Sequence, residues 1–182
     1  MQRVAELILE GCFLKQVPRS GYQFLGAGKE SVAEHVFSTI FIAYIMSQLE
    51  PEADSRKLMA MCLVHDLPEA RIGDLNYVQK KYLAADETSA LSHCLEGLTF
   101  GDAIKDLLEE FNTGSSLEAR LARDADQLAL LTDLKVLQGV GYTTPQSWLP
   151  HVKARLKTKI GKQLAQALSN IPHDGWWRKL FC

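Results

Sequence analysis

A histidine and an aspartate stand side by side at the end of an apolar run. The run covers residues 58–64 and leads directly into His65 and Asp66. Burying an imidazole beside a carboxylate costs free energy unless the pair binds a metal or is fully hydrogen-bonded. We therefore interpret His65 and Asp66 as half of a metal site, whose other ligands must come from elsewhere in the chain.

His35 is the next candidate ligand. It follows Ser31 and Glu34, whose spacing is that of a capping box and predicts the start of a helix. Residues 36–49 then form a broad apolar face, so His35 lies in an early turn of a core helix. A single histidine there is more often a hydrogen-bonded core residue than a ligand, so the metal interpretation depends on the other candidates.

Two aspartates, Asp124 and Asp126, interrupt the buried side of a long predicted helix. Side chains two residues apart on a helix point about 200° away from each other, so only one of the two can face the core. Leu130 and Leu134 continue the direction of Asp126, which makes it the better candidate. Asp124 stands beside Arg123 and suits a solvated ion pair. We expect Asp126 to be the fourth ligand and keep Asp124 as the alternative.

The candidate ligands are thus two imidazoles, His35 and His65, and two carboxylates, Asp66 and Asp126. A mixed set of this kind suits a divalent ion of intermediate character better than a thiolate-loving or purely oxygen-loving one. We expect one divalent ion, with Mn, Co, Fe, Ni, Zn and Mg as the candidates.

Helices must position these residues. No stretch alternates with the period of two that marks a β-strand, so we expect an all-α single domain of about six to eight helices around one core. A long helix should begin after Ser115 or Ser116 and end at Gly139. The other expected helices cover residues 3–14, 31–49, 55–66, a short segment before Gly73, 78–97, 102–111 and 146–169.

Pro68 is the break that matters for the site. Proline disfavours helical conformation in the residue before it and has no amide to donate. The helix that carries His65 should therefore end near Asp66, and a short second helix should follow. Neighbouring side chains at such a helix end can both reach one ion.

Composition indicates an ordinary globular protein of 182 residues, with 47% apolar and 23% charged residues. The 20 basic and 22 acidic residues leave no overall electrostatic footprint for a nucleic-acid polymer. The four cysteines form no C-x-x-C pair and suit reduced thiols. We find no signal-like N-terminus and expect no segment that reaches the length of a membrane span, so the cytoplasm is the expected compartment.

The C-terminal part, residues 146–182, should pack on the same domain. Its aromatic tail, residues 176–181, is too apolar to stay in water, and we expect it to cover the body or a second subunit. A homodimer is therefore expected.

The chain resembles the HD-domain metal-dependent phosphohydrolases. The resemblance rests on residues 31–35 (SVAEH), 65–69 (HDLPE), 73–75 (GDL) and 124–126 (DAD), and it spans roughly residues 10–140. Within that superfamily, the H-D-x-x-E-x-x-x-G-D spacing and an early arginine followed by an aromatic residue are similar to the 5′-deoxynucleotidase branch.

The resemblance implies a role for each matching position. It implies metal ligation by His35, His65, Asp66 and Asp126, catalytic assistance by Glu69 and Asp74, and substrate contact by Arg19 and Tyr22. Taken alone, Arg19 and Tyr22 would rather suit an exposed loop arginine and a core aromatic. Where the family often has a tryptophan after the arginine, this chain has Ser20. The extra histidines of the dinuclear phosphodiesterase branch do not match, which favours one metal.

The chemistry of these side chains agrees with hydrolysis of a nucleoside 5′-monophosphate. A bound divalent ion makes a nucleophilic hydroxide available near neutral pH. Glu69 could exchange a proton with the water or the leaving oxygen, Asp74 could orient the water, and Arg19 matches a phosphate. The alternatives are a phosphodiesterase or nucleoside-triphosphate hydrolase on the same metal, and a non-catalytic helical module stabilised by metal.

Overall fold

The protein is all-helical. The computed structural model describes residues 1–181; Cys182, the end of the predicted tail and one of the four cysteines, lies outside them. In the described residues there is no β-strand, only an isolated bridge between Pro18 and Ser31. Eight helices in this range have nine or more residues: α1 (Gln2–Phe13), α3 (Val32–Leu49), α4 (Ser55–Val64), α7 (Glu87–Leu95), α8 (Gly101–Thr113), α9 (Leu117–Gly139), α10 (Pro145–Arg155) and α11 (Lys159–Asn170). The short ones are η1 (Leu14–Gln16), α2 (Tyr22–Leu25), α5 (Glu69–Ile72), α6 (Tyr77–Tyr82) and α12 (Gly175–Arg178). The all-α prediction is confirmed.

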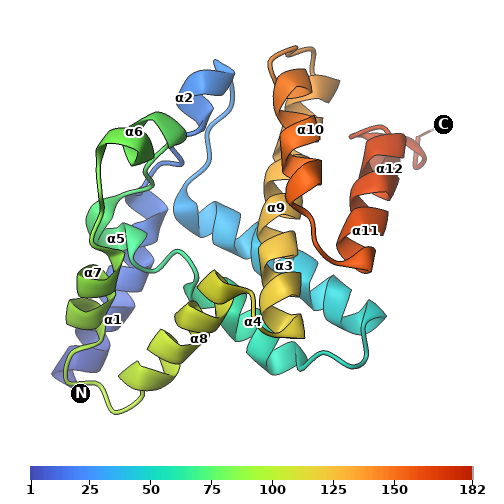
Figure 1. Ribbon diagram of the computed structural model, residues 1–182. Helices are drawn as coiled ribbons and strands as arrows, with labels where there is room; N and C mark the ends of the chain where they lie inside the picture. The colour runs from blue at the N-terminus through green and yellow to red at the C-terminus, as the bar shows by residue number, and fades with distance from the viewer. Residues whose placement is uncertain (182) are drawn as a thin grey trace.

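The core is organised around α9. This helix packs against α3, α4, α8, α10 and α11, and it runs through the centre of Figure 1. Its leucines Leu121, Leu128, Leu131 and Leu134 are fully buried, as their spacing predicts. Helices α10 and α11 lie on one side of α9, whereas α1, α5, α6 and α7 form the other side of the molecule (Figure 1).

Helix α3 begins at the predicted capping box. The Ser31 side chain accepts a hydrogen bond from the Glu34 amide, and the Glu34 carboxylate accepts one from the Ser31 amide. The 18 residues of α3 have a mean hydropathy of 1.3, which a membrane-crossing helix could also have, contrary to our expectation. In this fold α3 instead packs against α4 and α9 and carries His35 into the interior.

The break at Pro68 is confirmed. Helix α4 begins at an Asp54 cap and ends at Val64, and α5 starts at Glu69. Gly73 then adopts a φ of 74°, a left-handed conformation that favours glycine, and ends α5. His65 and Asp66 therefore lie in the turn between two helices.

Two expected long helices are each divided, so both predictions were wrong. The segment 78–97 is interrupted between α6 and α7, where the Asp86 side chain accepts the Ser89 amide and starts a new helix. The segment 146–169 is interrupted between α10 and α11, where Thr158 caps the second helix by accepting the Gly161 amide. Local hydrogen bonds from short polar side chains outweigh the apolar periodicity at both places.

Asp124 is buried, not solvated, and this corrects the expectation for it. Its side chain is 1% exposed and lies at the break between α10 and α11. The carboxylate accepts hydrogen bonds of 2.8 Å from the Lys157 amide and 2.7 Å from the Thr158 amide, and a third from the Thr158 hydroxyl. A methyl group on Gly161 would overlap the carboxylate, so glycine is needed there. Asp124 thus joins α9 to the C-terminal helices.

The aromatic tail is only partly covered by the body. His173 packs against Gly139 at the end of α9, so the chain after α11 returns to the core. Beyond it, Trp176 is 78% exposed, and Leu180 and Phe181 are also exposed. The body therefore does not cover these three side chains, and their covering by a second subunit stays a prediction.

Substitution of Asp124 should destabilise the fold. In Asp124→Ala, two backbone amides and a hydroxyl lose a charged acceptor in the interior, and we expect the free energy of unfolding to fall by at least about 2 kcal/mol. Asp102→Ala is the matched control, because this carboxylate is exposed and pairs only with Lys105, a contact worth less than about 1 kcal/mol. Equal denaturant midpoints for the two variants would contradict the assigned role of Asp124.

Candidate functional site

His35 and Asp126 meet in the interior, one from α3 and one from α9. The His35 ring is fully buried, and its Nε2 lies 2.9 Å from Oδ1 of Asp126. Asp126 therefore points to a different side of α9 from Asp124. Both aspartates face protein, which the angular argument did not foresee, because α9 is packed on opposite sides by α3 and by α10 and α11.

His65 and Asp66 reach the same place from the turn after α4. His65 donates from Nδ1 to the Cys62 carbonyl at 2.8 Å, which leaves its Nε2 as the free nitrogen. This Nε2 lies 3.2 Å from Oδ2 of Asp66, and that oxygen is also 4.0 Å from Nε2 of His35. Phe111 packs against the His65 ring at 5.2 Å and limits its movement.

Three of the four side chains form a group that could hold a divalent ion, and Asp66 adjoins it. One ligand atom each of His35, His65 and Asp126 lie within 4.8 Å of one another. Ligand atoms that share one ion at bond lengths of about 2.1 Å lie about 3 Å apart, close to the separations above. In the part of the chain that the structure describes, Nε2 of His65 and Oδ2 of Asp66 are buried without a hydrogen-bond partner. Buried polar atoms of this kind require an explanation, and a shared cation supplies one.

The charges at this place also favour a cation. Burial alone would lower the pKa of His65, but the carboxylates of Asp66 and Asp126 outweigh burial and raise it to about 9. Burial would raise the pKa of Asp126, but the hydrogen bond and charge of His35 outweigh it and hold that pKa below its ordinary value. The carboxylates thus attract positive charge to their shared space.

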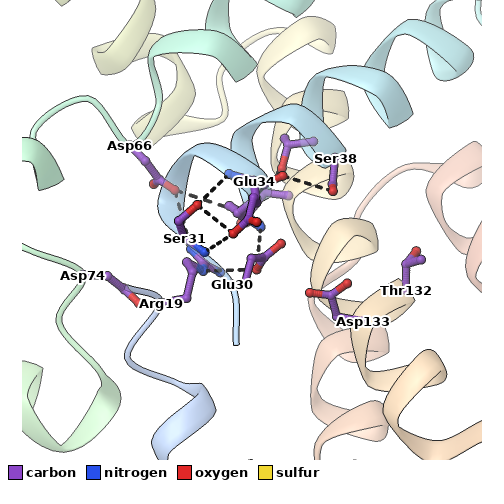
Figure 2. A network of polar contacts seen from close by, with 12 residues as sticks. Arg19, Glu30, Ser31, Glu34, Ser38, Asp66, Asp74, Thr132 and Asp133 are labelled. Atoms are coloured by element: carbon purple, nitrogen blue, oxygen red, sulfur yellow. Dashed lines mark hydrogen bonds and ion pairs between the residues drawn. The ribbon is translucent and has the colours of Figure 1, made fainter. Parts of the chain in front are cut away.

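Arg19 lies at the edge of this cluster. Its guanidinium is 3.5 Å from Oδ2 of Asp66, and its Nε is 3.8 Å from Oε2 of Glu30. Its backbone amide donates to the Glu30 carbonyl at 2.8 Å. Figure 2 shows Arg19 between Asp66, Asp74 and Glu30. The loop arginine is therefore turned inward, as the resemblance implies and against the exposed alternative.

Asp74 fixes the loop that carries Arg19. Its Oδ2 accepts hydrogen bonds of 2.7 Å from the Ser20 amide and 3.2 Å from the Ser20 hydroxyl. Glu69 lies on the same side, with its Oε2 buried and, among the described residues, without a hydrogen-bond partner. Burial, together with the charges of Asp66 and Asp74, raises the pKa of Glu69 to about 9. A carboxyl group with a raised pKa can keep its proton at neutral pH.

The ring and the hydroxyl of Tyr22 have different surroundings. Beside it lies Glu30, a buried acidic residue that the sequence analysis did not identify. The Tyr22 ring lines the cavity beside Arg19, but its hydroxyl is hydrogen-bonded to Asp133 and lies 3.4 Å from Glu30. Burial, and then the charge of Asp133, raise the pKa of Glu30 to about 8. Glu30 also lies 3.8 Å from Nδ1 of His35. In sequence it follows Lys29 in a polar loop, and no pattern marked it as buried.

A cavity of about 250 Å³ opens beside the four candidate ligands. Arg19, Asp66, Glu69, Asp74 and Asp126 line one part of it. The structure thus brings the predicted site residues together: Arg19, Tyr22, Asp66, Glu69, Asp74 and Asp126 line the cavity, and His35 and His65 contact Asp126 and Asp66.

This arrangement defines a helical domain with a paired His and Asp cluster at its centre. The chain belongs to the HD domain family, whose family model matches residues 13–168. That range contains all four candidate ligands as well as Arg19, Glu69 and Asp74.

The curated relatives of this chain carry the same name, 5′-deoxynucleotidase. Over 124 residues, the chain is 32% identical to 5′-deoxynucleotidase HDDC2 of Danio rerio, an alignment that covers 65% of this chain and 61% of the relative. It is 23% identical over 131 residues to 5′-deoxynucleotidase hdd1 of Schizosaccharomyces pombe, which covers 66% and 65% of the two chains. The chain therefore spans less than two thirds of the length of these relatives.

Solved structures share the whole fold. A conserved hypothetical protein from Pyrococcus furiosus superposes with a TM-score of 0.76 at 26% identity, over 92% of this chain and 99% of its own. A protein described as a predicted metal-dependent phosphohydrolase from Magnetospirillum magnetotacticum gives 0.70 at 21% identity, over 93% and 90%. At that identity the second likeness concerns the fold alone.

Metal should stabilise the protein through these side chains. At a concentration about a hundred times the dissociation constant, Mn²⁺ or Co²⁺ added to chelator-treated protein should raise the melting temperature by about 5–10 °C. We expect Asp126→Asn and His65→Ala to lose this shift, and His93→Ala, an exposed histidine on α7, to keep it. A full shift in Asp126→Asn would show that the ion binds elsewhere.

Proposed function

We propose that this chain is a metal-dependent phosphomonoesterase that hydrolyses deoxyribonucleoside 5′-monophosphates to the nucleoside and phosphate. The observation that carries the proposal is the convergence of two histidines and two aspartates beside a cavity that also holds Arg19, Glu69 and Asp74. Relatives named 5′-deoxynucleotidase support the substrate class. Because the chain spans only part of the length of these relatives, their activity is proposed for this chain on the basis of its own site residues.

His35, His65, Asp66 and Asp126 would hold one divalent ion, with Mn, Co, Fe, Ni, Zn and Mg as candidates. Such an ion polarises a phosphoryl oxygen and lowers the pKa of a bound water towards neutrality. The Cys62 carbonyl orients the His65 ring, so that Nε2 faces the ligand position. Glu30, close to Nδ1 of His35, could orient the other ring in the same way.

Arg19 would bind the phosphate. Its planar guanidinium offers two parallel donors to phosphate oxygens, and it lies within reach of the ligand cluster. Its position depends on Asp74, because the two hydrogen bonds from Ser20 to Asp74 hold the loop against the cavity. Asp74 would therefore position the phosphate-binding arginine in addition to orienting the attacking water.

Glu69 would act on the leaving group. In hydrolysis, water adds to phosphorus, the bond between phosphorus and the 5′-oxygen breaks, and the nucleoside oxygen takes up a proton. Glu69 is largely buried, protonated at neutral pH and directed at the same cavity as Arg19, so it can donate that proton. Its carboxylate could then recover a proton from water.

A homodimer in the cytoplasm completes the proposal. The described chain carries an exposed apolar stripe on α3, made of Phe37, Phe41 and Tyr44 at helical spacing, and Leu49 is exposed at the end of the same helix. Phe37 and Phe41 stack at 6.4 Å, and Phe37 is 71% exposed. A contiguous exposed apolar face is typical of an interface, and a second copy would cover it. We expect neither a membrane nor a nucleic-acid polymer as partner.

Phosphate release with Mn²⁺ or Co²⁺ tests the activity. A panel of deoxyribo- and ribonucleoside monophosphates, triphosphates and cyclic nucleotides should give phosphate and nucleoside from the deoxyribonucleoside monophosphates. Glu69→Gln should lower kcat by about 10²- to 10⁴-fold because proton transfer is lost. Glu87→Gln, an exposed glutamate on α7, should leave kcat unchanged.

Other reaction products would indicate a different function. Release of pyrophosphate or ring-opened nucleotide indicates a triphosphate hydrolase or phosphodiesterase. Metal-dependent melting without any turnover indicates a non-catalytic module, and full activity of Glu69→Gln removes Glu69 from the mechanism.

Sedimentation velocity tests the dimer. Phe41→Asp places a charge in the exposed stripe of α3 and should convert a dimer into a monomer. Leu9→Asp, at a more exposed apolar position on α1, should leave the sedimentation coefficient unchanged. A monomeric wild type would contradict the dimer. A Phe41→Asp variant that is still a dimer would show that the interface lies elsewhere.

A further inference from the structure

The cavity beside the candidate metal centre has two chemically different ends. Arg19, Glu69 and Asp74 belong to its polar lining; Tyr77, Leu130 and Trp148, which also line an adjoining hollow, mark the other end, together with the polar side chain of Arg155. Tyr77, Leu130 and Trp148 take no part in the proposed hydrolysis. A substrate with a charged end and a flat apolar end would match both parts of the cavity.

The apolar end lies one helical turn from the ligands. Leu130 follows Asp126 by four residues on α9, which is about 6 Å along the helix axis. A second hollow of about 190 Å³ adjoins it, shares Tyr77, Leu130, Trp148 and Arg155 with the first, and adds His151 and Val152. The apolar end therefore continues into a second hollow, about one helical turn from the candidate ligand Asp126.

Trp148 reaches this space from α10. Its indole lies against the backbone of the Arg19 loop: a Cβ at Gly21 would be 3.7 Å from Cη2 and 3.8 Å from Cζ3 of the ring. A side chain larger than alanine at residue 21 would thus meet the indole. Since Ser20 is hydrogen-bonded to Asp74, the loop under the indole is the same one that positions Arg19.

Tyr77 stands at the other wall, at the start of α6. It is 62% exposed, but it is held on two sides. Asn76 and Gln79 form a capping box that fixes the start of the helix. The Arg155 guanidinium lies 5.1 Å from the centre of the Tyr77 ring, a cation–π contact, and also 3.4 Å from Oε1 of Gln127. In Figure 1, α6 and α10 stand on either side of α2.

We propose that Trp148 and Tyr77 form the nucleobase subsite of the enzyme, with Trp148 as the surface on which the base stacks. The inference rests on the proposed function, since it takes the phosphate to be at Arg19. Of the polar groups near this end, Arg155 and Gln127 already contact Tyr77 or each other, and His151 also lines the adjoining hollow. Recognition by stacking depends on ring area, so several bases are accepted and purines bind more tightly than pyrimidines.

Kinetics separate this subsite from the phosphate site. Base–aromatic stacking gives an expected rise in KM of about 5- to 100-fold for purine deoxynucleotides in Trp148→Ala. Deoxyribose 5-phosphate, which has no base, should show the same KM in Trp148→Ala as in wild type. Trp148→Phe should restore most of the affinity, Tyr77→Ala should weaken purine binding selectively, and Trp177→Ala on α12 should change neither substrate.

Fluorescence tests the same contact without catalysis. The chain has three tryptophans, so the double variant Trp176→Phe, Trp177→Phe leaves Trp148 as the only indole. Deoxyadenosine should quench its emission saturably, and deoxyribose should not. With Trp148→Phe, the remaining tail tryptophans should show no saturable quenching.

The outcomes distinguish the two proposals. The subsite would be overturned, and the hydrolase kept, if Trp148→Ala raised KM equally for deoxynucleotides and for deoxyribose 5-phosphate. The same holds if the nucleoside did not quench the emission of Trp148. Saturable quenching by nucleosides in a protein that hydrolyses no phosphate ester would support the subsite and reject the hydrolase.

Discussion

The contact on which the structure depends is the buried hydrogen bond between His35 of α3 and Asp126 of α9. It joins the two longest helices of the described chain in the interior, at the point where their packing is closest to the cavity. A histidine and a carboxylate that are taken out of water must be compensated by one another or by an ion. Every other element of the site, from the turn after α4 to the Arg19 loop, is arranged around this contact.

Carboxyl groups are concentrated at the site. Asp66, Glu69, Asp74 and Asp126 line the cavity, and its cationic lining residues are Arg19, Lys80 and Arg155. The charges of Asp66 and Asp126 raise the pKa of His65 against the effect of burial, and burial together with the charges of Asp66 and Asp74 raises the pKa of Glu69. Buried carboxyl groups lower stability unless they are compensated, and natural folds keep such arrangements at functional sites. This grouping of carboxyl groups is thus the physical basis for the expected affinity for a divalent ion.

Local sequence signals predicted those features that depend on local chemistry. The capping box at Ser31 and the proline at residue 68 placed two helix boundaries, and the apolar run before His65 placed the candidate ligands. Features that depend on contacts between distant segments were missed. Asp124 is buried only because the break before Thr158 brings two amides to it, and Glu30 is buried only because Asp133 and Tyr22 approach from elsewhere. The hydrophobic pattern of either segment alone gives no sign of a contact with a residue that is distant in sequence.

The two aspartates of α9 have a joint consequence. Asp124 is bonded to the start of α11 and the end of α10, and two residues later Asp126 faces the opposite side of the same helix, towards His35. Rotation of α9 about its axis would therefore break contacts on both sides at once. The C-terminal helices, which lie outside the segments that carry the proposed catalytic groups, set the angular position of Asp126, a candidate metal ligand. Sequence changes far from the cavity, at the junction between α10 and α11, can in this way tune the geometry of the centre.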